Sequence, residues 1–327
     1  MTDTTTGTAP DSAIPSEADW DHAPSLVDGA NSLELTAAEC DLQYWLRAVP
    51  QGTLRGKVLG HDENVRPHEV TRRPGPLNDA LTQELAFRSI AEDKATRALG
   101  YMVALAPDTA TMEFYTTQLM DEARHSMVFR NHLLSLGVAQ QDLFTTIDRL
   151  AAADRDAVLV PLENLGLEVL RDQADFIGGV VVLTILVEGV LAPAAQLSEL
   201  KWRVFDPAAA DVERGAGIDE IRHLTVGSSV AREHLLAHPE DKERILELIT
   251  RGRKLWENLP ATEMTLRRET LFQKGLDAHR DLAGDYEIWP GRRLVDTTVE
   301  ERVGTAHEWS ESMQRKRLLY MGLEEAI

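Results

Sequence analysis

Two short segments repeat the same pattern of acidic, basic and imidazole side chains. Residues 121–125 read Asp-Glu-Ala-Arg-His and residues 219–223 read Asp-Glu-Ile-Arg-His, so both follow D-E-x-R-H at a separation of 98 residues. On a helix, a glutamate and a histidine three positions apart share one face and can bind one metal centre. A single E-x-x-H carries little weight in an acidic helical chain, whereas two copies of the longer pattern indicate a two-metal site.

The first motif needs another carboxylate from the helix that precedes it. Residues equally far from the turn of a helical hairpin lie side by side, and the expected turn is at residues 107–108. Counting back from this turn reaches Glu92, 30 residues before Glu122, and its neighbour Asp93. Glu84 would lie about 12 Å from the level of Glu92, at ~1.5 Å per residue. Glu92 is therefore the predicted ligand, with Glu84 and Asp93 as alternatives.

The second motif has one obvious carboxylate partner. Glu188 lies 32 residues before Glu220 and is the only acidic residue in the apolar segment 181–189. Burying a lone carboxylate is costly unless it is paired or bound to a metal. Glu188 is therefore expected to be a ligand on the strength of its surroundings alone.

These residues make a hard, oxygen-rich ligand set that suits two iron or manganese ions better than zinc. Four carboxylates also balance the charge of two divalent ions. Asp121 and Asp219 are each expected to accept an N–H from a metal-bound histidine across the bundle, and Arg124 and Arg222 to pair with surrounding acids. The complete predicted ligand set is Glu92, Glu122, His125, Glu188, Glu220 and His223.

The elements that must position these ligands are helices, and the predicted fold class is all-α. Caps, prolines and apolar periodicity predict long helices at about 78–104, 109–136, 162–205 and 207–237. A crossover helix and loop at 139–160 separates two antiparallel hairpins, which is the organisation of a four-helix bundle with one long connection. Three amphipathic helices near 240–257, 261–283 and 298–324 are expected to form a C-terminal helical cover over 240–327, and no strand is predicted.

The remaining N-terminal segment divides in two. Residues 1–34 are rich in Thr, Asp, Ser and Pro and are predicted to be a disordered or extended tail. Thr36 and Glu39 form a capping-box pattern that predicts a short helix ending near Val49. Residues 35–327 are therefore interpreted as one helical domain.

Composition limits the partners and the compartment. The net charge is −20, which argues against nucleic acid and anionic membranes as partners. The single cysteine, Cys40, cannot form a disulfide within the chain, so a reducing cytoplasm is expected. The longest apolar run, residues 176–191, is interrupted by Gly178, Gly179 and Glu188, so no membrane-spanning helix is predicted.

The paired motifs resemble those of ferritin-like di-iron carboxylate proteins of the ribonucleotide reductase small-subunit type. They are most similar to the bacterial multicomponent monooxygenase hydroxylases, over about residues 78–238. The resemblance implies a ferritin-like bundle that binds two iron ions, or manganese and iron, and activates O2. It also implies bridging roles for Glu122 and Glu220 and mainly terminal roles for Glu92 and Glu188. The size and architecture further resemble, more weakly, the di-iron proteins of valanimycin-type azoxy natural-product pathways.

Several positions depart from these relatives. Phe129 stands where the reductase subunit carries its radical tyrosine, so a radical-storing subunit is not expected. Ala192 stands where the monooxygenases carry an active-site threonine, for which Thr184 is a speculative substitute. Ala216 stands where arylamine N-oxygenases carry an extra histidine. The motifs therefore identify the superfamily better than the substrate.

The predicted function is that of a stand-alone, O2-activating di-iron oxygenase acting on a small metabolite, with nitrogen as the expected site of oxygenation and secondary metabolism as the expected context. The alternatives are a C-hydroxylase, a desaturase or oxidase that inserts no oxygen, and a metal-storage or structural subunit. An electron donor is required, either a ferredoxin, a flavin reductase or a small reductant. Arg315, Lys316 and Arg317 are a candidate docking patch. A homodimer is expected from the resemblance.

Two further features leave two interpretations open. His132 shares a helical face with His125, and it is expected to lie in the surroundings of the site or on the surface instead of binding metal. Gly215 and Gly217 lie just before the second motif. They indicate either close helix packing, or room for a ligand or a π-bulge.

Overall fold

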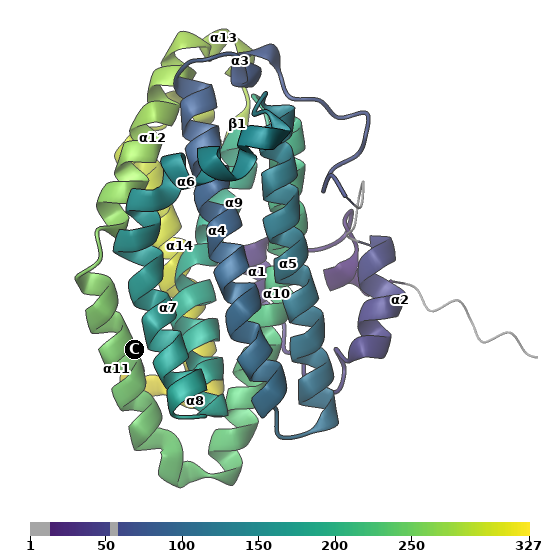
Figure 1. Cartoon of the computed structure of the whole chain (residues 1–327), viewed down its shortest axis with the longest axis vertical. Coiled ribbons are helices and arrows are strands. Elements are labelled where there is room, and N and C mark those ends of the chain that lie inside the picture. Colours follow the sequence, from purple (N-terminus) through teal and green to yellow (C-terminus); the bar gives the residue numbers. More distant parts are fainter. Residues whose placement is uncertain (1–13, 53–57) are drawn as a thin grey trace, which may run out of the picture.

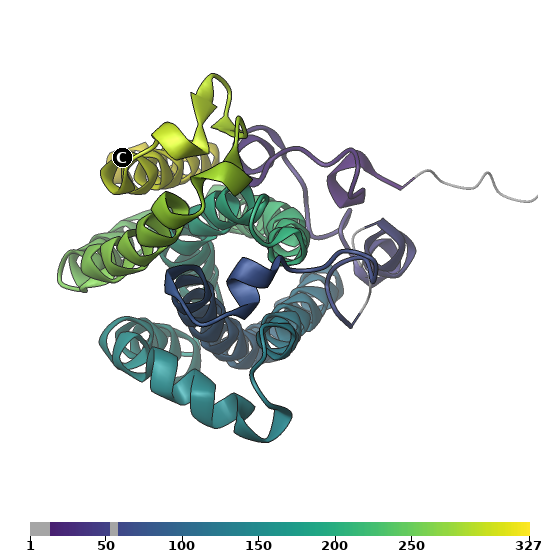
Figure 2. The same cartoon turned by 90° about the horizontal axis from the view of Figure 1, so that it is seen from above.

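Four long helices form the centre of the protein. The computed structural model describes residues 14–52 and 58–327, and these are mostly helical, as predicted. Figures 1 and 2 show the four helices grouped around a common axis. They are α4 (Pro76–Leu105), α5 (Thr109–Ser135), the composite helix α8 to α9 (Phe176–Trp202) and α10 (Pro207–Ala237).

Side-chain caps define where these helices begin. Asp108 accepts a hydrogen bond from the backbone N–H of Thr111 at the start of α5. Asp206 does the same for Ala209 at the start of α10, where Pro207 is the first helical residue. A capping carboxylate satisfies an N–H that has no partner within the helix, and proline tolerates this position because it has no N–H to lose.

The third helix begins at Phe176, so the prediction of one helix over 162–205 is wrong. Ala174 adopts a left-handed backbone conformation, with φ of 52°, and Asp175 then caps the N–H of Gly178. A non-glycine residue in this conformation interrupts a right-handed helix. The helix also contains a π-helical segment, Val182–Glu188, between α8 (Phe176–Val181) and α9 (Gly189–Trp202).

The crossover is longer than predicted. It begins with α6 (Leu143–Asp154) and α7 (Val160–Leu167), which are joined by a π-helical turn at Arg155–Leu159 and followed by another at Glu168–Asp172. Residues 143–172 are therefore almost continuously helical where a helix and loop over 139–160 were expected. This helix packs on the outside of α4 (Figure 1).

The third bundle helix also corrects the expectation that no segment could span a membrane. Phe176–Trp202 is long and apolar enough by length and composition, although 78% of its most apolar window is buried inside the protein. Helices at the centre of a globular protein have this composition because other helices surround them. The burial matches that of a core helix.

The C-terminal cover contains α11 (Lys242–Glu257), α12 (Ala261–Ala278), the short α13 (Arg280–Ala283) and α14 (Val299–Met321). Helix α12 packs against α4, and α14 packs against α9 and α10. The cover is not purely helical, because β1 (Glu287–Trp289) and β2 (Arg292–Arg293) form a small antiparallel hairpin. Gly291 makes its turn with φ of 76°.

Part of the predicted N-terminal tail is folded. Residues 1–13 lie outside the described residues, but α1 (Leu26–Ser32) packs against α10 and α14. Gly29 allows close contact, since a Cβ atom there would lie 2.7 Å from Ile221 Cδ1. The short predicted helix begins later than expected, as α2 (Leu42–Gly52). Thr36 and Glu39 still form their reciprocal hydrogen bonds.

The hydrophobic core is divided into two main parts along the bundle. One contains Phe87, Val128 and Ala216, and the other contains Leu99, Tyr115 and Val226. On α4, α5 and α10, the predicted ligands lie between these two sets in sequence. The bundle therefore carries a polar layer enclosed by apolar packing at both ends.

Candidate metal centre

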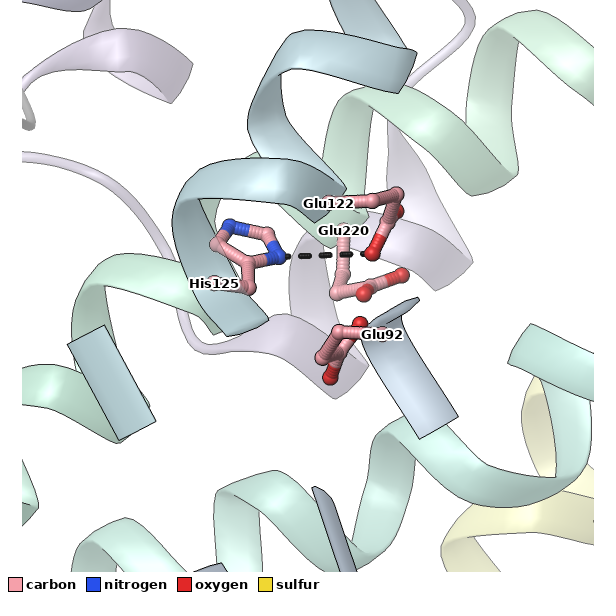
Figure 3. Close-up of side chains that lie close together, drawn as sticks. All are labelled: Glu92, Glu122, His125 and Glu220. Carbon is pink, nitrogen blue, oxygen red and sulfur yellow. Dashed lines mark ion pairs between the residues drawn. The ribbon is translucent and has the colours of Figure 1, made fainter. Parts of the chain in front are cut away.

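The structure brings all six predicted ligands into two overlapping groups in this polar layer. The first group is Glu92, Glu122, His125 and Glu220, and the second is Glu122, Glu188, Glu220 and His223. Within each group, one potential ligand atom per residue lies within 4.8 Å of the others. Figure 3 shows the carboxylates of the first group converging beside the His125 ring. Glu122 and Glu220 belong to both groups, which is the position of bridging ligands.

The atoms that face this space are buried and lack hydrogen-bond partners among the described residues. They are both carboxylate oxygens of Glu122, one each of Glu188 and Glu220, and Nδ1 of His125 and His223. They contact one another instead: His223 Nδ1 lies 3.1 Å from Glu122 Oε1, and His125 Nδ1 lies 3.5 Å from Glu122 Oε2 (Figure 3). Buried polar atoms without hydrogen bonds are costly, and bound cations would remove this cost. Oxygen and imidazole donors with this composition fit a pair of iron or manganese ions.

Two of the carboxylates are destabilised in their charged form. Burial, and then the charge of Glu122, raises the pKa of Glu92 well above its ordinary value. Burial, and then the charge of Glu220, does the same to the pKa of Glu188. Bound cations would reverse this cost, because a nearby positive charge favours the ionised carboxylate.

Gln118 supports Glu188 and was not anticipated from the sequence. Its side-chain amide donates a hydrogen bond to Glu188 Oε1 over 2.6 Å. The bond orients the carboxylate so that Oε2 is left without a protein partner. Gln118 is one turn before Glu122 on α5, and such a helical spacing is too common to single out a functional glutamine.

Glu122 and the two histidines stabilise one another. Burial by itself would raise the pKa of Glu122, but the side chains of His125 and His223 hold it well below its ordinary value. Burial would likewise lower the pKa of both histidines, but Asp219 and Glu122 raise that of His125. Asp121 and Glu122 raise that of His223. In the absence of metal, protons on the imidazoles therefore supply part of the positive charge of the site.

The outer nitrogen of each histidine pairs with an aspartate on the opposite helix. His125 Nε2 lies 3.1 Å from Asp219 Oδ2, and His223 Nε2 lies 3.3 Å from Asp121 Oδ2. These are the pairings across the bundle that were expected from the sequence. An Nε2–H donated to a carboxylate leaves Nδ1 as the free lone pair, directed at the site.

Arginines and a tryptophan hold the two aspartates in place. Arg124 donates to Asp219 over 2.7 Å, and Arg222 donates to Asp121 and, at 3.4 Å, to Asp219. The half-buried Trp45 on α2 donates its indole N–H to Asp121 Oδ1 over 2.9 Å. The sequence analysis missed Trp45, because no local pattern links residues 76 positions apart.

The alternative ligands lie elsewhere. Asp93 is exposed and pairs with Arg97 on the outside of α4. Glu84 is buried against Ser198 and Lys201. His132 belongs to neither group of potential ligands; it is buried, so it does not lie on the surface, and it pairs with Asp206 at 3.1 Å. The structure therefore places Glu92 in the cluster in preference to Glu84 and Asp93.

A cavity of about 210 Å³ adjoins the carboxylates of Glu92, Glu122, Glu188 and Glu220. It continues between α4 and α9 and is covered by α11, α12 and α14. Its exposed lining residues, Thr262 and His307, mark an opening between α12 and α14. Most of the wall is apolar, and it includes Leu183, Val187, Leu191, Leu197, Met264 and Val303.

The helix beside this cavity is irregular, and neighbouring side chains satisfy its freed carbonyls. Pro193 has no N–H to give to Gly189, and the Ser310 hydroxyl donates to the Gly189 carbonyl over 2.9 Å instead. Trp256 donates to the Leu186 carbonyl over 2.6 Å. The π-helical segment thus lies on the third helix, ending at Glu188, and not around Gly215 and Gly217, which lie in regular α-helix.

Thr184 does not line the cavity among the residues described. It packs against α10, where a Cβ atom added to Gly227 would lie 2.2 Å from Thr184 Oγ1. The suggested substitute for the monooxygenase threonine therefore faces a helix contact instead of the candidate reaction space. The wall contains Ala192 where that threonine was expected.

No family model matches this chain, and no curated protein matches it either.

Proposed function

We propose that this chain is a ferritin-like di-iron carboxylate oxygenase that acts on a small molecule. The observation that carries the proposal is the overlap of two buried four-residue groups through Glu122 and Glu220, beside an apolar cavity. Two iron ions bound by these residues would supply the redox chemistry that activates O2.

The residues of the chain have separate parts in this proposal. Glu92 with His125, and Glu188 with His223, would each bind mainly one ion, whereas Glu122 and Glu220 would bridge them. Asp121 and Asp219 hold the imidazoles in the binding tautomer. The apolar cavity orients the substrate and excludes bulk water, which protects reactive groups from side reactions.

The overall reaction defines the co-reactants. One oxygen atom of O2 enters an N–H or C–H bond of the substrate and the other leaves as water. Two electrons from an external donor and two protons balance the reaction. Nitrogen as the acceptor rests on the resemblance to azoxy-pathway proteins, and the size of the cavity favours a small metabolite.

An electron donor would dock on a smaller basic patch than the sequence suggested. Arg317 is buried and donates to the Leu33 carbonyl, so only Arg315 and Lys316 of the three candidate residues are exposed. We also propose that the protein forms a homodimer and that it is located in the cytoplasm.

The test is anaerobic iron loading followed by mixing with O2. Two irons per chain, O2 uptake and 18O from 18O2 in the product support the oxygenase. Uptake of O2 with an oxidised but unlabelled product indicates the desaturase or oxidase alternative. Iron binding with no substrate-dependent O2 uptake indicates storage or a structural role and contradicts the proposal.

A further inference from the structure

A second group of buried ionisable residues lies in the bundle outside the candidate metal centre. Glu84 on α4, Ser198 and Lys201 on α9, and Glu213 on α10 are all at least nine-tenths buried. Glu84 and Lys201 line the same cavity as the ligand carboxylates. None of these residues belongs to either group of potential ligands, so the cluster needs its own explanation.

The hydroxyl of Ser198 contacts two carboxylates at once. Its Oγ makes a short hydrogen bond with Glu84 Oε1 and lies 3.2 Å from Glu213 Oε1. A serine hydroxyl has one proton to donate, and an ionised carboxylate has none. One proton shared between two acceptors makes two weaker hydrogen bonds, so both contacts are full hydrogen bonds when one of the two glutamates carries a proton.

The surroundings decide which glutamate is protonated. Glu84 Oε2 accepts from Lys201 Nζ at 2.9 Å and from Trp202 Nε1 at 3.4 Å. Hydrogen bonds donated to a carboxylate favour its ionised form. The shared proton is therefore assigned to Glu213, so that Glu213 can donate to Ser198 while Ser198 donates to Glu84.

Glu213 has one direct cationic neighbour. Arg88 on α4 approaches it with an Nε–Oε2 distance of 3.3 Å, but the contact lacks hydrogen-bond geometry at both atoms. Arg88 also stacks on the ring of Phe129 from α5. Lys201, the other nearby cation, is neutralised by Glu84 and by Glu269 from α12.

The pKa of Glu213 agrees with the assignment of the shared proton to this residue. Burial raises the pKa of Glu213 to about 7, and the charge of Glu84 adds to this rise, whereas Arg88, the hydrogen bond with Ser198 and Lys201 oppose it. A carboxyl group that titrates near neutral pH can both hold a proton and release it.

The cluster is aligned with the candidate metal centre. Glu84, Arg88 and Glu92 follow one another at intervals of four residues on α4, and all three line the cavity. Arg88 reaches within 4.0 Å of Glu92. The cavity therefore joins the inner end of the cluster to the ligand carboxylates.

From this arrangement we infer that Glu213, Ser198 and Glu84 hold one exchangeable proton and pass it to the cavity beside the metal centre. The O–H bond of Glu213 breaks as Ser198 accepts the proton, and the Ser198 proton moves to Glu84, which releases it into the cavity. The inference rests on the proposed function, because O2 reduction there consumes the protons. These residues are positioning residues, since none of them touches the candidate metal ions.

The first experiment needs no metal and no turnover. Infrared difference spectra of the metal-free protein between pH ~6 and pH ~8 detect the carbonyl stretch of a protonated carboxyl group. The expected result is a band that titrates near pH 7 in the native protein and in Glu163→Gln, a control on the outer face paired with Lys94. Glu213→Gln is expected to lose one component of this band, whereas any component from Glu92 or Glu188, whose pKa values are also raised, is common to all three proteins. Spectra of Glu213→Gln that match those of the native protein and of Glu163→Gln would overturn the shared proton.

A second experiment tests delivery and does not depend on whether Glu213→Gln folds. Ser198→Ala keeps both carboxylates but breaks the path, whereas Ser198→Thr keeps a hydroxyl. In iron-loaded protein under single turnover, Ser198→Ala is expected to slow substrate oxidation about tenfold or more, and D2O is expected to slow the native protein and Ser198→Thr. Equal rates and equal D2O effects in all three proteins would overturn delivery.

The two experiments also separate this inference from the proposed function. A native protein that shows the component lost in Glu213→Gln but takes up no O2 contradicts the oxygenase and proton delivery, and leaves the shared proton established. A native protein that oxidises substrate but lacks this component contradicts the proton cluster alone.

Discussion

Asp121 Oδ2 lies 3.3 Å from His223 Nε2, although the two residues are 102 positions apart and belong to opposite helices. The reciprocal contact joins His125 to Asp219 at 3.1 Å. Each D-E-x-R-H segment therefore provides the aspartate that orients the histidine of the other segment. Neither motif makes a complete half-site by itself, which explains why the aspartates are as much part of the pattern as the glutamates.

Replacing Asp219 with asparagine tests this crossed arrangement. We expect Asp219→Asn to weaken metal binding by about 10- to 100-fold, because the imidazole of His125 loses its charged acceptor. Competition with a chelator measures the affinity. Asp93→Asn, on the exposed face of α4, serves as the control, and equal affinities for the two variants would contradict the orienting role.

Trp45 provides a milder version of the same test. Trp45→Phe removes only the indole N–H donated to Asp121. It is expected to weaken metal binding in the same direction as Asp121→Asn but by less, since the carboxylate and Arg222 stay in place. A loss as large as that of Asp121→Asn would mean that α2 shapes the site in some further way.

The overlap of the two ligand groups predicts that alanine variants of the glutamates differ in the number of metal ions bound per chain. Glu122→Ala and Glu220→Ala are expected to lose both ions, because these residues belong to both groups. Glu92→Ala and Glu188→Ala are expected to keep about one ion per chain, since each removes a ligand from one group. Metal analysis after anaerobic loading and gel filtration measures the content, with Glu163→Ala as the control. A uniform loss across all four variants would contradict distinct bridging and terminal roles.

Metal loading is expected to release protons at neutral pH. The pKa values of Glu92 and Glu188 are raised well above 4.5 and those of His125 and His223 above 6.5, so the metal-free site retains protons that bound ions displace. An indicator dye in weak buffer measures the release. The number released is expected to fall as the pH rises through these raised values, and a number independent of pH would contradict the assignment.

The same pKa shifts determine whether the stability of the metal-free protein rises or falls with pH. Groups with a raised pKa bind more protons in the folded chain than in the unfolded chain, so unfolding free energy falls as the pH rises. For the two histidines, this contribution is complete below their ordinary value of 6.5 and is lost as the pH rises through the folded value. Thermal unfolding should therefore occur at lower temperature as the pH rises above neutrality, and metal loading should remove the trend.

Filling the cavity is expected to separate substrate oxidation from metal binding. Ala306 on α14 lines the cavity away from the ligands, so Ala306→Trp should keep the metal content and abolish substrate-dependent O2 uptake. Glu311→Trp is the matched control on the same helix, because Glu311 is exposed and does not line the cavity. Full activity in Ala306→Trp would show that the substrate binds elsewhere.

The packing of α1 gives a prediction about stability. Gly29→Ala is expected to destabilise the fold by about 1–3 kcal/mol, because the added methyl group overlaps the buried Ile221 side chain. Gly304→Ala should be neutral or slightly stabilising, as alanine is favoured over glycine in helices. Chemical denaturation of both variants measures the difference, and equal stabilities would mean that α1 is not part of the folded core.

The sequence by itself is sufficient to predict the helical class and the residues that form the buried Glu/His cluster. The reason is local: the E-x-x-H spacing defines one face of a helix, and Glu188 is conspicuous because its surroundings are apolar. The bounds of α5 and α10 were predictable for a similar reason, since Asp108, Asp206 and Pro207 act within one turn of the helix that they start.

Only the tertiary structure could decide which distant side chains meet. The place of Glu84 in a separate buried cluster, the contact of Trp45 with Asp121, and the shared hydroxyl of Ser198 depend on how separate helices pack. The break before the third helix arises from the left-handed backbone at Ala174. The packing of α1 depends on a close contact at Gly29. Apolar periodicity predicts neither of these features. Long-range packing thus determines the surroundings of each buried glutamate, and with them its proposed role as a ligand in one layer of the bundle or as a proton carrier in the next.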